Sequence, residues 1–231
     1  MNTALLTIDD FSSANTPAMV DYLTEKGIQP IFFATGANVE RFWAEALYAL
    51  QKGMLVGNHS YSHPHFSEIT LEEAIREIDQ CEQVLDRLYR EAGVERTFRP
   101  FRFPYGDKGG DHQEGIQQYL KEKGFHKVKD THFHYPWWKE TGLDQAIDTL
   151  WTFDFQEYML RPGSAFTKED IWQKMHNPAP ETGAALFNEK NRHSLLLHAH
   201  DETDEMLPGY YKLFIDHLLE NGIVFDRPEF L

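Results

Sequence analysis

Apolar residues along the chain gather in short runs that are separated by longer stretches of mixed polarity. A short apolar run bounded by Gly, Pro or polar residues is typical of a buried strand. Several of these runs are followed directly by acidic or histidine residues, so the carboxyl end of the strand is polar. The predicted strands are Leu5–Ile8, Ile28–Phe33, Met54–Val56, Phe98–Phe103, Thr149–Phe153, Ser194–Leu197 and Ile223–Phe225.

The stretches between these runs carry apolar residues at helical spacing. Thr16 and Pro17 predict a helix start with Thr16 as the N-cap, and Gly27 predicts the end of that helix. Thr70 and Glu73 have the spacing of a capping box, which predicts the start of a long helix. The longer predicted helices run over about Val39–Lys52, Leu71–Ala92, Gln113–Glu122 and Pro208–Asn221.

Strands that alternate with helices predict an α/β fold built on a parallel sheet or barrel. The chain has 231 residues, which is enough for one large domain of this kind. It contains no internal repeat and no Pro/Gly-rich linker. We therefore expect residues 1–231 to form a single domain.

Polar residues whose side chains could bind a metal or act in catalysis lie at, or just beyond, the carboxyl ends of the predicted strands. These ends converge on one face of a barrel or wound sheet, and active sites lie on that face. The shared placement favours one functional site over scattered surface residues. The residues are Asp9, Asp10, His59, His63, Arg102, Tyr105, Asp154 and His198.

His59 and His63 are four residues apart, so both imidazoles can turn toward one metal ion. A metal held by neutral histidines usually needs a carboxylate as well, and Asp9 or Asp10 can supply it. Such a set leaves coordination positions open for water and substrate, as catalytic sites require. A metal of this kind lowers the pKa of a water from 15.7 toward roughly 7.

The remaining polar residues fit the other roles in the hydrolysis of an amide or ester. The second Asp of the pair can take the proton of the water, and Arg102 can hold that carboxylate ionised. His198 is a suitable acid for the leaving group, and Asp154 could orient its imidazole. A backbone N–H near Tyr105 could stabilise the oxyanion.

Composition limits the partners that we expect. The net charge of −15 argues against a surface that binds nucleic acid or an anionic membrane. Cys81 is the one cysteine, so the chain cannot form an internal disulfide. The chain begins without a basic region or a long apolar run, which predicts a cytoplasmic protein, although a chain from which a signal had been removed would look the same. The oligomeric state stays open.

Five motifs in this sequence resemble those of the NodB-homology polysaccharide deacetylases, also called family four carbohydrate esterases. They occur in the order of that family and extend over most of the chain. The motifs are Thr7-Ile8-Asp9-Asp10-Phe11, His59-Ser60-Tyr61-Ser62-His63, Arg102-Phe103-Pro104-Tyr105, Asp154-Phe155-Gln156-Glu157-Tyr158 and Leu196-Leu197-His198.

The resemblance implies a distorted, incomplete (β/α) barrel and a metal-dependent carbohydrate deacetylase. Such an enzyme removes N-acetyl groups from an N-acetylated sugar or polysaccharide, and so hydrolyses linear amides with a metal-activated water. The family usually uses Zn²⁺, with Co²⁺, Ni²⁺ or Mn²⁺ as alternatives. The resemblance assigns the metal to Asp10, His59 and His63, the base to Asp9, the acid to His198, and supporting roles to Arg102 and Asp154.

The sequence departs from the family pattern at three places. Phe11 stands where the family has Gly, and Glu157 and Tyr158 stand where it has Asp and Trp. His200 follows His198 closely and competes with it for the role of the acid. The aromatic run at residues 135–138 could stack on sugar rings or pack beneath a loop.

Two alternative functions remain open at this point. The substrate could be another acyl compound, such as an O-acetylated xylan, a short sugar or a small non-sugar amide. The chain could also be a relative that binds carbohydrate without catalysis.

Overall fold

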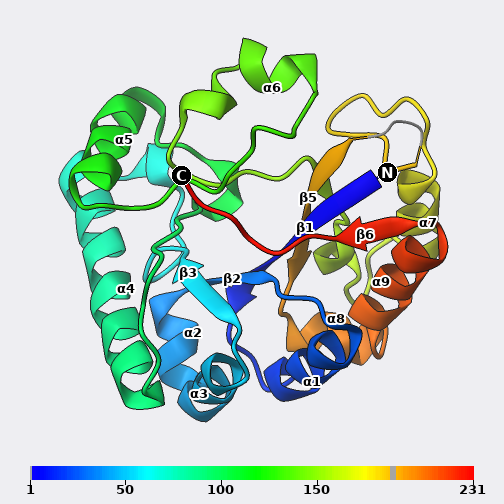
Figure 1. Cartoon of the computed structure of the whole chain (residues 1–231), viewed down its shortest axis with the longest axis horizontal. Coiled ribbons are helices and arrows are strands. Elements are labelled where there is room, and N and C mark those ends of the chain that lie inside the picture. The colour runs from blue at the N-terminus through cyan, green and yellow to red at the C-terminus, as the bar shows by residue number, and fades with distance from the viewer. Residues whose placement is uncertain (1, 188–190) are drawn as a thin grey trace.

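A parallel β-sheet forms the centre of the molecule, and helices surround it (Figure 1). The computed structural model describes residues 2–187 and 191–231. Within these ranges the sheet has the strand order β3-β2-β1-β5-β4, and β6 also pairs with β1. The strands are β1 (Asn2–Phe11), β2 (Ile31–Ala34), β3 (Leu55–Asn58), β4 (Phe153–Asp154), β5 (Arg192–His198) and β6 (Ile223–Phe225).

Strand β1 lies at the centre of the sheet and has different neighbours along its two halves. Its first residues pair with β6, and its last residues pair with β2. Strand β5 runs along its other side, in a register that sets Asp9 opposite His198. Every pairing between these six strands is parallel, so the carboxyl ends of β1, β3 and β5 open on the same edge of the sheet.

The helices follow the strands in the alternating order that the sequence predicts. Figure 1 shows α1, α3, α4 and α9 on the outside of the molecule, with β1 between them. No helix in the described ranges has an apolar stretch long enough to cross a bilayer. The helices are α1 (Thr16–Lys26), α2 (Gly36–Arg41), α3 (Trp43–Gln51), α4 (Leu71–Ala92), α5 (Gln113–Glu122), α6 (Pro136–Glu140), α7 (Lys168–Met175), α8 (Asp201–Met206) and α9 (Tyr210–Glu220).

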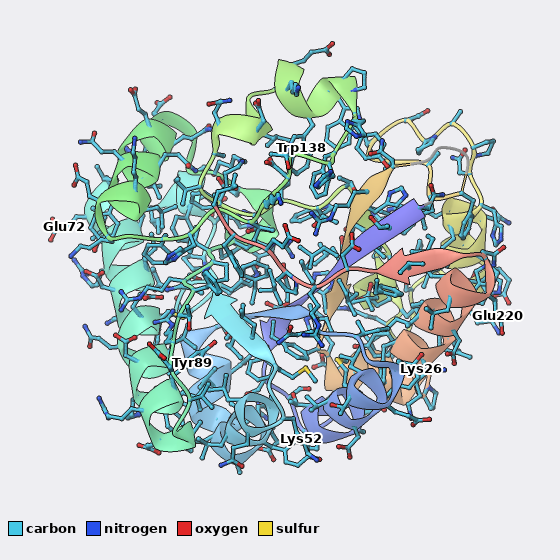
Figure 2. The ribbon with its side chains drawn as sticks, in the orientation of Figure 1. Lys26, Lys52, Glu72, Tyr89, Trp138 and Glu220 are labelled. Carbon is cyan, nitrogen blue, oxygen red and sulfur yellow. The ribbon has the colours of Figure 1, made fainter. Side chains whose placement is uncertain are left out.

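Helix α4 shows how the local sequence signals produce the fold. The predicted capping box is present, because Thr70 and Glu73 each accept the backbone N–H of the other. On the inner face, the Tyr89 hydroxyl donates to the carbonyl of Val56 in β3 and accepts the N–H of the same residue. Glu72 points away from the sheet, and Tyr89 lies on its inner side (Figure 2). The amphipathic pattern therefore fixes α4 against β3.

Residues 98–103 do not form the predicted strand. They contribute one isolated bridge, between Phe101 and Asn58. Pro100 has no N–H for a ladder, although its carbonyl accepts the N–H of Asn58. The segment still lies beside β3, so Arg102 enters the site without a regular strand before it.

Three predicted helix boundaries were also wrong. The helix predicted over 39–52 is two helices, because Phe42 adopts φ −119° and ψ 51° between them. The N-cap of α1 is Asn15, while the Thr16 hydroxyl accepts the N–H of Ser13 instead. Helix α9 begins at Tyr210, after Gly209 at φ 69°.

Candidate metal centre and active site

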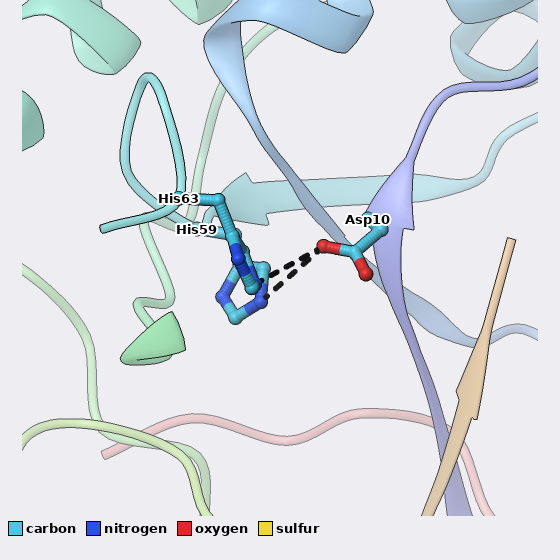
Figure 3. Close-up of side chains that lie close together, drawn as sticks. All are labelled: Asp10, His59 and His63. Carbon is cyan, nitrogen blue, oxygen red and sulfur yellow. Dashed lines mark ion pairs between the residues drawn. The ribbon is translucent and has the colours of Figure 1, made fainter. Parts of the chain in front are cut away.

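Asp10, His59 and His63 bring their side chains together at the carboxyl edge of the sheet (Figure 3). The Nε2 atom of His63 lies 3.3 Å from Asp10 Oδ1, and Nε2 of His59 lies 3.8 Å from the same oxygen. One ligand atom from each residue lies within 4.8 Å of the other two. Two imidazole nitrogens and a carboxylate oxygen so arranged could hold one cation.

The backbone around these residues sets their direction. Asp10 at the end of β1 has φ 58°, and His63 has φ 64°, values that few non-glycine residues adopt. The backbone N–H of His63 donates to the Ser60 hydroxyl oxygen over 3.1 Å. The Nδ1 atom of His59 lies 2.8 Å from the carbonyl oxygen of Arg102. Because a carbonyl only accepts, Nδ1 carries the hydrogen, and Nε2 is free to bind a metal.

These three residues fit a divalent transition metal. Mixed nitrogen and oxygen donors suit Zn²⁺, Co²⁺, Ni²⁺ or Mn²⁺ better than Ca²⁺, which prefers oxygen alone. Burial lowers the pKa of His63 to about 4, against the opposing charge of Asp10, so the imidazole is neutral at pH 7 and able to bind a metal. The identity of the metal stays a prediction.

Asp9 lies beside this group and is paired with Arg102. The guanidinium of Arg102 donates to Asp9 Oδ1 over 2.7 Å, and also to the Thr7 hydroxyl and the Thr149 carbonyl. The other carboxylate oxygen of Asp9 lies 3.5 Å from Nε2 of His59. The predicted contact between Arg102 and the Asp that does not bind the metal is thus present, and that residue is Asp9. The role of Asp9 as base stays a prediction.

The imidazole of His198 is held by Glu157 and not by Asp154, the partner predicted from the sequence. Glu157 Oε1 accepts the backbone N–H of His198 over 2.6 Å and lies 3.1 Å from its Nδ1. Burial lowers the pKa of His198, but the charge and hydrogen bond of Glu157 outweigh this effect and raise it to about 9. His198 is therefore protonated at neutral pH.

Asp154 lies close to this pair and makes a different contact. Its Oδ1 atom accepts the backbone N–H of Gln156. This hydrogen bond closes a turn, and Glu157, the next residue, contacts the imidazole. Burial and the nearby charge of Glu157 raise the pKa of Asp154 to about 6. Two carboxylates this close cannot both carry charge easily, and Glu157 occupies the position beside His198.

A cavity of about 330 Å³ is lined by the metal set, Asp9, Asp154 and His198, whereas Arg102 and Glu157 lie behind its wall. Tyr105 stands at its mouth, 58% exposed, with its ring stacked on His65 at 3.8 Å between centroids. The residues that line it include every predicted site residue except Arg102, which lies beneath Asp9. The others that line it are Trp151, Tyr158, Arg161, Leu196 and His200.

Two residues of this site do not follow from the sequence motifs alone. Glu157 occupies a place where the related motif has Asp, and that position was the available signal. His200 lies with Nε2 2.7 Å from Asp10 Oδ2. Its spacing from His198 predicts a rival acid, but the contact with Asp10 joins residues 190 positions apart in the sequence.

Comparison with known proteins identifies the family. A family model described as polysaccharide deacetylase matches residues 1–128, more than half of the 231 residues. The chain belongs to the polysaccharide deacetylase family. A peptidoglycan-N-acetylglucosamine deacetylase of Bacillus cereus is 34% identical to this family member over 103 residues. That match covers 44% of the chain and 36% of the relative.

Solved structures show the same fold over nearly the full length of this polysaccharide deacetylase family member. A crystal structure of a peptidoglycan N-acetylglucosamine deacetylase has a TM-score of 0.67 and 19% identity, covering 97% of this chain and 85% of that one. A family four carbohydrate esterase pseudoenzyme from Bacillus anthracis has a TM-score of 0.64 and 17% identity, covering 96% and 62%. At these identities the likeness establishes the fold, a parallel-sheet α/β fold like the distorted barrel of the family.

Proposed function

We propose that this protein hydrolyses the N-acetyl group of an N-acetylated sugar or polysaccharide and releases acetate. The observation that carries the proposal is the presence of three groups in one cavity. They are the set formed by Asp10, His59 and His63, the carboxylate of Asp9 beside it, and the protonated imidazole of His198.

Each residue has a place in amide hydrolysis. A divalent cation bound to the three-residue set would acidify a water molecule and polarise the acyl carbonyl. Asp9, which is paired with Arg102, accepts the proton of the attacking water. His198, kept protonated by Glu157, donates a proton to the nitrogen of the leaving amine. After one turnover Asp9 has gained a proton and His198 has lost a different one, so exchange with solvent must restore both side chains before the next turnover.

The shape beside the site supports a sugar chain in preference to a small amide. A second cavity of about 360 Å³ shares Tyr105, Trp151 and Asp154 with the first. It is also lined by the partly buried ring of Trp137, whereas Trp138 is buried and donates to Asp130. Aromatic rings beside polar groups suit the faces and hydroxyls of sugars. The relative from Bacillus cereus, named for N-acetylglucosamine, agrees with such a substrate.

A second candidate function is carbohydrate binding without catalysis. The Bacillus anthracis structure shows that the fold occurs in a pseudoenzyme. The retained set favours catalysis here, because binding alone requires neither the ion pair of Arg102 with Asp9 nor the contact of Glu157 with His198.

The test is acetate release from a panel of acetylated compounds. It should contain N-acetylated chitooligosaccharides of increasing length, peptidoglycan, O-acetylated xylan and a small aryl acetamide. The proposal expects release from at least one N-acetylated glycan, and faster release than from the small amide. Binding of glycans without release from any compound by the zinc-loaded protein would favour the second candidate.

A further inference from the structure

The carboxylate of Asp10 divides its two oxygens between different partners. Oδ1 faces the imidazoles of His59 and His63, while Oδ2 lies 2.7 Å from Nε2 of His200. Within residues 2–187 and 191–231, no other group donates a hydrogen bond to this carboxylate. The contact with His200 is therefore what fixes the rotation of the Asp10 side chain.

The contact also fixes the tautomer of His200. An ionised carboxylate only accepts hydrogen bonds, so Nε2 of His200 carries the hydrogen. The Nδ1 atom on the other side of the ring is buried and has no hydrogen-bond partner among the described residues. With its N–H already given to Asp10, His200 is not available to protonate a leaving group.

The chain around His200 also connects the start of α8 to the loop after β1. His200 lies between β5 and α8, and the next residue, Asp201, accepts the backbone N–H groups of Ala14 and Asn15. Those two residues lie in the loop after β1, the strand whose last two residues are Asp10 and Phe11. Two neighbouring side chains thus hold the end of β1, and the ring of His198 packs against His200 at 5.2 Å between centroids.

We infer that His200 is a positioning residue that holds the Asp10 carboxylate with Oδ1 toward the cation, and that it is not the acid of the reaction. This inference rests on the proposed function, since it needs a cation at Asp10. Groups that hydrogen-bond a metal ligand in this way typically change metal affinity by about 10–100-fold. His200 itself lies outside the set of atoms close enough to share one ion.

The experiment compares the zinc affinity of metal-free full-length protein by competition with a chromophoric chelator. His200→Leu removes the donor, His200→Gln keeps an N–H donor, and His198→Ala removes the neighbouring imidazole. We expect zinc binding to weaken about 10–100-fold in His200→Leu. We expect His200→Gln and His198→Ala to stay within a few-fold of wild type. Thermal unfolding of the metal-free proteins shows whether a variant has lost its fold instead.

Three results would overturn the inference. Equal zinc affinity in wild type and His200→Leu would show that the contact does not support the cation. Equal weakening in His200→Leu and His200→Gln would show that the hydrogen bond is not the cause. A wild-type protein that binds no divalent cation would overturn both the proposed function and this inference. The first two results would overturn the inference alone, because in them the wild-type protein still binds zinc.

Discussion

The guanidinium of Arg102 donates a 2.7 Å hydrogen bond to Oδ1 of Asp9, and both side chains are removed from water. Arg102 is fully buried, and it has Thr7, Thr149 and the ring of Phe33 around it. A buried arginine stabilises a carboxylate only when the pair stays intact. This pairing leaves the second oxygen of Asp9 directed at the metal set, 3.5 Å from His59.

Replacing Asp9 by Asn should separate catalysis from cation binding. The amide oxygen of Asn can still accept from Arg102, but it is not basic enough to take a proton. We expect kcat to fall by about 10²–10⁴-fold, with zinc affinity within a few-fold of wild type. Acetate release and chelator competition on the same sample measure the two quantities. Normal turnover would place the base elsewhere, and loss of zinc would make Asp9 a ligand.

The pH profile of kcat/KM should report the pair of His198 and Glu157. Burial lowers the pKa of His198, but the charge and hydrogen bond of Glu157 raise it by more, so that it lies at about 9 and above its ordinary value of 6.5. The protonated acid is therefore present at neutral pH and is lost as pH rises through about 9. In Glu157→Gln the alkaline limb should move down by about 1–3 pH units. An alkaline limb that does not move in this variant would remove Glu157 from the account.

Gly57 controls the approach of β3 to the segment that carries Arg102. A Cβ at this position would lie 2.7 Å from both the carbonyl oxygen and Cγ of Pro100. We expect Gly57→Ala to lower the free energy of unfolding by about 1–3 kcal/mol, and to weaken zinc binding because His59 lies two residues further on, directly after β3. Denaturant unfolding and chelator competition measure the two effects.

The matched control for Gly57→Ala is Gly115→Ala in α5. The three heavy atoms nearest to a Cβ there all belong to the flexible side chain of Leu71, the closest at 3.1 Å. Alanine favours a helix over glycine by about 1 kcal/mol, which offsets that close contact. We expect its free energy of unfolding to change by less than about 1 kcal/mol. Equal losses in the two variants would show that the approach of Pro100 is not the cause.

The parts of the fold with local signals could be predicted from the sequence. The helix Gln113–Glu122 and the strand Ile223–Phe225 have the predicted bounds. The capping box at Thr70 is present. The convergence of strand ends also predicted that Asp9, Asp10 and His198 lie at one edge, and all three line the same cavity. This prediction depends on the parallel sheet and not on details of the loops.

The parts that depend on distant contacts could not be predicted. The run Phe98–Phe103 has three phenylalanines, which favour a strand, but in the structure it forms a single isolated bridge. The partner of His198 lies 41 residues away, and a change of Asp to Glu in the motif obscured it. The partner of Asp10 lies 190 residues away, in a position that suggests an acid instead. Sequence spacing indicates which residues lie in the same site, but not which of their atoms form hydrogen bonds with one another.

The most direct test of the central claim is acetate release by wild-type protein before and after removal of its metal. Asp10, His59 and His63 are proposed to hold the cation that hydrolysis requires. Treatment with EDTA followed by desalting should abolish release from an active N-acetylated glycan, and one equivalent of Zn²⁺ or Co²⁺ should restore it. The same addition should restore no activity in His63→Ala. Undiminished release by protein shown to contain no metal would contradict the account.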